Sequence, residues 1–284
     1  MTGIVGGLLA ALLWGSSTVT DARATRIVGA VGVLGWGSIA GCTITLPIAL
    51  IFAHEDSGVG ARGLLWLTIS SLAAVAAFAP FYRAVRLGPV PLVAGIGALE
   101  GAVAATISFA AGERLPALTL CGLVIALGGM TFVLTSVRVP VPQGHGHPLQ
   151  AGLLATLAAS LFGLSLFAGA RAIEQVPELW LPAGSRTFGT VLISIPLMLL
   201  GLLPRPGRFL RFVFYSALAQ SSGYFAFLVA AGSSGVSVPA VLASQASVVG
   251  MVISFLVLGE RLSRRQLAGI GALLTGVALV AATR

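Results

Sequence analysis

The sequence predicts an all-α integral membrane protein with ten transmembrane helices, arranged as two inverted five-helix repeats around a central cavity. Three observations support this: an apolar composition, recurring runs of membrane-spanning length, and landmarks that recur in order in both halves. The 284 residues are 57% hydrophobic and 8% charged, with a mean hydropathy of +1.03. Soluble domains carry about 25% charged residues, so a water-soluble enzyme or a nucleic-acid-binding domain is excluded.

Apolar runs between charged or Pro/Gly-rich breaks give the expected helices, since roughly 20 residues cross a bilayer. The first run resembles a signal peptide because Ala22-Arg23-Ala24 follows it, but no basic residue precedes it, so we treat it as a true span. The net charge of +8 comes from arginines scattered between spans, which suits contact with membrane lipid head groups. The expected helices are 3–20, 28–53, 63–82, 90–111, 116–137, 150–172, 181–203, 209–231, 236–258 and 264–282.

The chain divides into a first repeat, 1–137, a polar connector, 138–149, and a second repeat, 150–284. An odd number of spans per repeat makes the second copy enter the membrane from the opposite side. Inverted repeats are a recurring transporter architecture, because rocking one copy against the other gives alternating access to a central site. The landmarks that recur are Trp14-Gly15 with Phe162-Gly163, Pro47 with Pro196, and Gly112-Glu113-Arg114-Leu115 with Gly259-Glu260-Arg261-Leu262.

These landmarks resemble the EamA-like branch of the drug/metabolite transporter superfamily. Trp14-Gly15 in the first helix and Gly259-Glu260-Arg261-Leu262 before the last helix carry the resemblance, with Gln266, Gly269 and Gly276 following. Leu99-Glu100 is similar to a Leu-Glu-Pro pattern of the family, with Gly101 in place of proline. The resemblance implies a ten-helix basket around a central cavity that moves amino acids, metabolites or drugs, outward by family habit.

Glu100 is the first candidate for the chemistry of transport. It lies near the middle of the run 90–111, where a charged side chain is costly and ionisable groups are functional by default. We expect it to face a cavity and to bind and release a proton. The alternative is a protonated Glu100 that hydrogen-bonds a neighbouring helix and serves packing only.

Arg186 and Gln220 are the next candidates. Arg186 lies about one turn inside its run and is predicted to anchor an anionic substrate group or to pair with Glu100. The alternative is that it extends to the membrane interface. Gln220 is a mid-span amide that needs hydrogen-bond partners in hydrocarbon. Aromatic and hydroxyl side chains at helical spacing complete the expected cavity lining, with helix packing as the alternative. These are Trp14, Ser17, Phe78, Tyr82 and Tyr224.

Pro47 and Pro196 interrupt helices at matching points of the two halves, so they are candidate hinges beside a binding site. Gly37 and Gly41 are spaced for close helix contact and are interpreted as structural. Glu113-Arg114 and its counterpart at 260–261 are predicted to form interfacial ion pairs at span ends.

No cofactor is expected, because the sequence has no phosphate-binding loop, His-Glu-x-x-His or Cys-x-x-Cys motif. His145 and His147 alone make a poor metal site. The expected partners are a small-molecule substrate and membrane lipid. A monomer suffices to enclose a cavity, and a dimer stays open.

The expected location is a bacterial plasma membrane. Arginines are unequally divided between alternate connectors, and the positive-inside rule puts the richer set in the cytoplasm and both termini outside. The family resemblance implies cytoplasmic termini instead. The richer set is Arg23, Arg26, Arg83, Arg86, Arg138, Arg205, Arg208, Arg211, Arg261, Arg264 and Arg265, and the poorer is Arg62, Arg114, Arg171 and Arg284.

The sequence thus predicts a secondary transporter of a small polar or amphipathic metabolite, such as an amino acid, and not an enzyme. Two alternatives stay open. One is an integral-membrane enzyme or lipid-handling protein that uses Glu100 and Arg186 at a lipid head group. It lacks the clustered partner that acid–base chemistry needs. The other is a scaffold that transports nothing.

Overall fold

Every regular element that the structure describes is a helix. The computed structural model describes residues 2–53, 60–87, 96–97, 99–135, 148–246, 248–250 and 252–253, and single residues or pairs between 264 and 279. The elements are α1 (Thr2–Phe52), α2 (Ala61–Leu87), α4 (Glu100–Ala110), α5 (Ala117–Thr135), α6 (Pro148–Ala172), α7 (Trp180–Gly189), a π-helical turn (Thr190–Ser194), α8 (Ile195–Leu199), α9 (Leu210–Ser234) and α10 (Ser237–Ala243). The all-helical prediction is confirmed for this part of the chain.

Five of the described helices are long and apolar enough to cross a membrane, and three further apolar helices are shorter. The predicted connector and its two histidines lie almost entirely outside the described residues, as do 90–95 and most of the last predicted span. The five long segments are Thr2–Thr25, Ile27–Phe52, Ala61–Phe81, Leu149–Ala172 and Leu210–Ser234, and the shorter ones are Glu100–Ala110, Ala117–Gly129 and Ser237–Gly250.

The first two predicted spans are joined by a single glycine. Gly29 has φ 77° and ψ 166°, outside the helical region, so α1 is two helices that meet at a sharp corner. Glycine is suited to this corner because it has no Cβ to clash at positive φ. The first of the two helices therefore continues well past residue 20, its predicted end, and carries Asp21 inside the bundle.

The two predicted hinge prolines lie in different surroundings. The helix continues through Pro47 to Phe52. Pro196 comes directly after the π-helical turn, which separates α7 from α8. A proline cannot donate the backbone hydrogen bond to the fourth residue before it, and π-turns of this kind often mark functional places in helices. Of the two prolines, Pro196 therefore adjoins a break in the helix and Pro47 does not.

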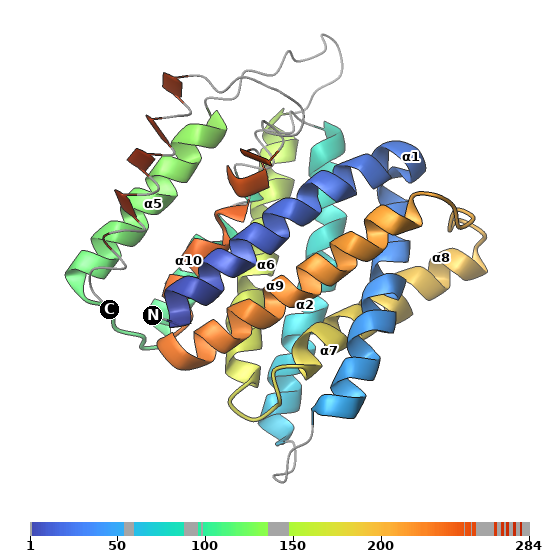
Figure 1. Ribbon diagram of the computed structural model, residues 1–284, viewed down its shortest axis with the longest axis horizontal. Coiled ribbons are helices and arrows are strands. Elements are labelled where there is room, and N and C mark those ends of the chain that lie inside the picture. Colours follow the sequence, from blue (N-terminus) through green and yellow to red (C-terminus); the bar gives the residue numbers. More distant parts are fainter. Residues whose placement is uncertain are drawn as a thin grey trace.

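Small residues let the helices approach closely. The first part of α1 runs beside α9, and α6 packs along α2 (Figure 1). At Gly6 an added Cβ would come within 2.7 Å of the Ala226 carbonyl oxygen, so the α1–α9 contact requires glycine there. Small-residue contacts are the usual means of helix association in membranes. The polar residues described next come from α1, α7 and α9.

Candidate functional site

A chain of hydrogen bonds joins three helices inside the bundle. Arg186 of α7 donates from Nη2 to Oε1 of Gln220, at 2.8 Å. Gln220, near the middle of α9, donates in turn from Nε2 to Oδ2 of Asp21, at 2.9 Å, and to Oγ of Ser216, at 2.8 Å. Intramembrane charges are found paired or facing a cavity. Here a neutral amide lies between the cation and the anion.

Glycine at position 41 makes room for the arginine. A Cβ at Gly41 would lie 2.7 Å from Cγ of Arg186, too close for any real contact. The second part of α1 and α7 can therefore cross closely, with the Arg186 stem filling the space between them. The backbone of Arg186 is held as well, because Thr190 donates from its hydroxyl to the Arg186 carbonyl oxygen at 2.9 Å.

A small cavity of about 40 Å³ borders this chain. It has room for water but not for a metabolite, since ligand pockets typically measure about 300–1,000 Å³. Phe78 is the predicted aromatic residue that reaches it. The lining residues are Asp21, Val33, Leu34, Gly37, Ser38, Phe78, Arg186, Val213, Ser216, Ala217 and Gln220.

Two more predicted aromatic residues adjoin Gln220. Trp14 donates from Nε1 to the Gln220 carbonyl oxygen at 3.0 Å. Tyr224 stacks on Phe227 with ring centroids 6.2 Å apart, and its hydroxyl lies 2.8 Å from Oγ of Ser70. Three of the predicted site residues, Phe78, Arg186 and Gln220, thus line the small cavity. Trp14 bonds the Gln220 backbone without lining the cavity, and Tyr224 lies one turn further along α9.

Other predicted site residues lie elsewhere. Ser17 is buried and donates to the carbonyl oxygen of Trp14 in its own helix, at 2.8 Å. Glu100 begins α4, which packs on α6 and α10, and it is not among the residues lining the small cavity. Within the part of the chain that the structure describes, its carboxylate has no hydrogen-bond or ion-pair partner. The side chain of Tyr82 lies outside the described residues.

Asp21 is the site residue that the sequence analysis missed, because it follows the predicted end of the first span. The signal for it is present in the sequence. Trp14, Ser17 and Asp21 are spaced by three and four residues, which places them on one face of a helix. Extending the predicted helix by a single residue, from 20 to 21, would have added an acid to a face already chosen as cavity lining.

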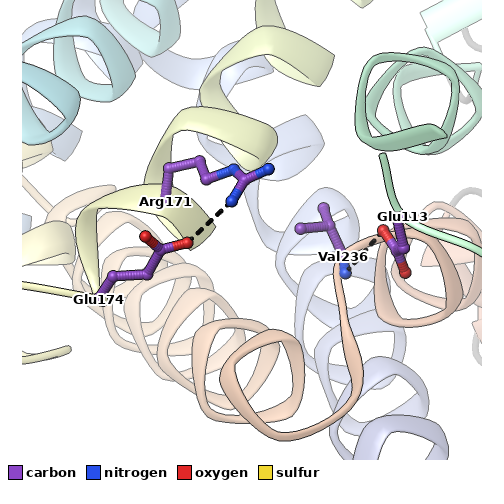
Figure 2. Close-up of polar contacts among 4 residues, drawn as sticks. All are labelled: Glu113, Arg171, Glu174 and Val236. Carbon is purple, nitrogen blue, oxygen red and sulfur yellow. Dashed lines mark hydrogen bonds and ion pairs between the residues drawn. The ribbon is translucent and has the colours of Figure 1, made fainter. Parts of the chain in front are cut away.

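A second, larger cavity of about 720 Å³ opens at the end of the bundle, between the ends of α4, α6 and α9. Figure 2 shows two polar contacts beside it. Arg171 donates from Nη1 to Glu174 at 3.0 Å, and the Glu113 carboxylate accepts from the backbone nitrogen of Val236 at 3.3 Å. Glu113 also accepts from the hydroxyl of Ser237, at 2.9 Å. We call this the outer cavity.

The predicted ion pair at Glu113-Arg114 is therefore replaced by a helix cap. The Glu113 carboxylate binds the first amides of α10, where a negative charge is favoured by the helix dipole. Gly235, with φ 81°, turns the chain so that these amides face Glu113. The counterpart at 260–261 lies outside the described residues. In the described part of the chain, no group of three or more His, Cys, Asp or Glu side chains could hold a metal ion.

Comparison with known proteins gives a family and a fold. The model of the EamA-like transporter family matches residues 1–135 and 149–282. Among solved structures, one protein crystal structure is similar with a TM-score of 0.79 and 18% sequence identity, covering 99% of this chain and 96% of that chain. At that identity the similarity shows the fold alone. No curated protein matches the sequence.

Proposed function

This chain belongs to the EamA-like transporter family of membrane proteins, and we propose that it is a secondary transporter of a small polar or amphipathic metabolite, such as an amino acid. The observation that supports this most is the Arg186–Gln220–Asp21 chain, which lies among membrane-spanning helices and beside a cavity. We propose that a carboxylate of the substrate displaces Gln220 from Arg186, and that Trp14 and Tyr224 contact its apolar part. Arginine suits this role because its planar fork matches a carboxylate.

The proposed architecture is ten helices in two inverted five-helix repeats. Support comes from glycines that make matching contacts in the two halves. A Cβ at Gly15 would lie 2.7 Å from Cβ of Val249, and a Cβ at Gly163 would lie 2.6 Å from Cβ of Val103. Each half thus packs its first helix on the fourth helix of the other half, as an inverted repeat with exchanged partners requires.

The crossing of the second and seventh spans adds a further matching pair. Gly41 faces Arg186, and Gly189 faces Ser38, whose Oγ would lie 2.7 Å from an added Cβ. Arg186 and Ser38 therefore occupy related positions, on either side of the proposed two-fold axis. In repeat transporters the substrate site lies at such an interface.

The proposed cycle is alternating access. A cavity of about 40 Å³ is too small for an amino acid, so binding requires the helices around Arg186 to separate. The outer cavity is the proposed path on the side of the N-terminus. Pro47 and Pro196 are the proposed hinges, and Glu100 stays a predicted proton-sensitive group. Outward transport across a bacterial plasma membrane is the direction and location that the family resemblance suggests.

The experiment is counterflow in proteoliposomes with a panel of radiolabelled metabolites, comparing wild type with Arg186→Gln. Arg211→Gln is the matched control, because Arg211 is an exposed arginine over the Phe212 ring and lines neither cavity. We expect saturable counterflow for at least one solute, lost in Arg186→Gln and kept in Arg211→Gln. Absence of counterflow for every solute would favour a scaffold, and unchanged transport by Arg186→Gln would remove Arg186 from the site.

A further inference from the structure

The Gln220 amide is placed so that each of its ends meets a group of opposite charge. A primary amide accepts at its oxygen and donates at its nitrogen. In this structure the oxygen faces the Arg186 cation and the nitrogen faces the Asp21 carboxylate. This orientation matches an ionised Asp21, which can only accept hydrogen bonds.

We infer that Asp21 carries a proton during transport and that Gln220 transmits its protonation state to Arg186, so that a proton and an anionic substrate group bind together. The inference rests on the proposed function, because it assigns the coupling ion at the same site. The small cavity beside Asp21 has room for the water that would deliver the proton.

The chemical step is a single proton transfer. When Oδ2 of Asp21 takes a proton from a hydronium ion in the cavity, which becomes water, the carboxyl group gains an O–H donor where the nitrogen of Gln220 donates. Turning the amide lets its oxygen accept from Asp21. Its nitrogen then faces Arg186, and because two donors cannot share a hydrogen bond, Arg186 loses its hydrogen bond to Gln220. The Ser216 hydroxyl serves both orientations, since it accepts or donates equally well.

Electrostatics also favours binding of an anion at Arg186 when Asp21 is protonated. Asp21 and Arg186 are the charged residues among those that line the small cavity. The second part of α1 contributes Val33, Leu34, Gly37 and Ser38, α2 contributes Phe78, and α9 contributes Val213, Ser216, Ala217 and Gln220. An anion that binds Arg186 while Asp21 is ionised makes the site negative. With Asp21 protonated, the same anion makes the site neutral, which costs less among membrane-spanning helices.

Proton and anion binding are therefore linked, and the linkage is reciprocal. The proton raises affinity for the anion, and the anion raises affinity for the proton. Because both occupy the site together, they cross the membrane in the same direction, so the gradient of the anion itself, and not proton entry, drives export. Couplings of this kind typically change affinity by about 5- to 150-fold.

The binding test uses the purified full-length protein with benzoate, an aromatic carboxylate, and benzamide, its neutral analogue. Wild type is expected to bind benzoate about 5- to 150-fold more tightly at acidic than at alkaline pH. It should also take up protons on binding, measured with an indicator dye in weak buffer. Benzamide should cause no proton uptake. Equal proton uptake with both compounds would overturn the inference.

Two variants compare the carboxylates. Asp21→Asn resembles the protonated residue, so it should bind benzoate with little dependence on pH and without proton uptake. Glu100→Gln tests the competing assignment of the proton to Glu100, and it keeps the proton uptake of wild type if Asp21 is the carrier. The reverse result, loss in Glu100→Gln and retention in Asp21→Asn, would assign coupling to Glu100 and overturn the inference.

A measurement without ligand separates this inference from the proposed function. Infrared spectroscopy detects a protonated carboxyl group by its C=O band. On acidification we expect a band that is absent in Asp21→Asn and shifted in Gln220→Leu, which removes its hydrogen-bond partner. A band unchanged in both variants would refute the role of Asp21. If both variants behave as expected but no solute is transported, the transporter proposal fails while the link between Asp21 and Gln220 stands.

Discussion

An arginine and a carboxylate are paired in two regions of this protein, once inside the bundle and once at its end. At the end, Arg171 bonds Glu174 directly at 3.0 Å, with side chains 37% and 54% exposed. Inside, Arg186 and Asp21 are joined through Gln220. Exposed pairs contribute about 0–1 kcal/mol to stability, because water solvates each charge almost as well as its partner does.

The comparison teaches that access of water decides how strongly two charges depend on each other, more than direct contact between them does. The inner charges have little water to replace a lost partner, so each depends on the other despite the amide between them. The charges of Arg171 and Glu174 are exposed, so water solvates either one when its partner is lost. The following substitutions test this difference, beginning with the largest expected effect.

Arg186→Gln should have the largest effect, because it leaves Asp21 without its cation. Breaking a buried pair typically costs about 3–5 kcal/mol of unfolding free energy. Denaturant unfolding in detergent measures this cost. The double variant Asp21→Asn/Arg186→Gln should regain part of the loss, since no uncompensated charge remains. A double variant whose loss equals the sum of the two single losses would show that the charges do not interact.

Gly41→Ala should cause the second-largest loss of unfolding free energy, because the added Cβ overlaps the Arg186 side chain. Overpacking of this kind typically costs about 1–3 kcal/mol. Gly37→Ala is the matched control on the same helix, where an added Cβ meets nothing within 4 Å. It should be neutral or stabilising by up to about 1 kcal/mol. Thermal unfolding of both variants checks this, and equal behaviour would contradict the close crossing at Gly41.

Glu113→Gln should have a smaller effect, because the neutral side chain still accepts hydrogen bonds but loses its attraction to the start of α10. Charges at helix ends contribute about 0.3–1 kcal/mol when exposed. Hydrogen exchange of the Val236 and Ser237 amides measures the loss locally. Amides that exchange as slowly as in wild type would show that Glu113 is not their cap.

Arg171→Gln should have the smallest effect, at most about 1 kcal/mol. High salt should reduce it further, because screening is effective between exposed charges. A salt titration of the unfolding free energy of wild type and variant measures both quantities. If Arg171→Gln were as costly as Arg186→Gln, the contrast between the two regions would be lost.

Composition predicts the helical membrane class, because spanning helices need long apolar runs. The family was suggested by the resemblance of short local landmarks such as Trp14-Gly15 and Gly259-Glu260-Arg261-Leu262. Tertiary detail is harder to predict. The hydrogen bond from Gln220 to Asp21 links helices that lie 199 residues apart in the sequence. Asp21 was missed because a charged residue beside an arginine resembles a connector, and the helix continues past it only because Gly29 makes the turn alone. The π-turn before Pro196 has no sequence signal beyond the proline itself.

The corner at Gly29 has a mechanical consequence. With one non-helical residue between them, the first and second spans share a pivot at Gly29. The corresponding link in the second half, 173–179, is longer. A rocking motion would therefore bend the first half at one residue and the second half along several.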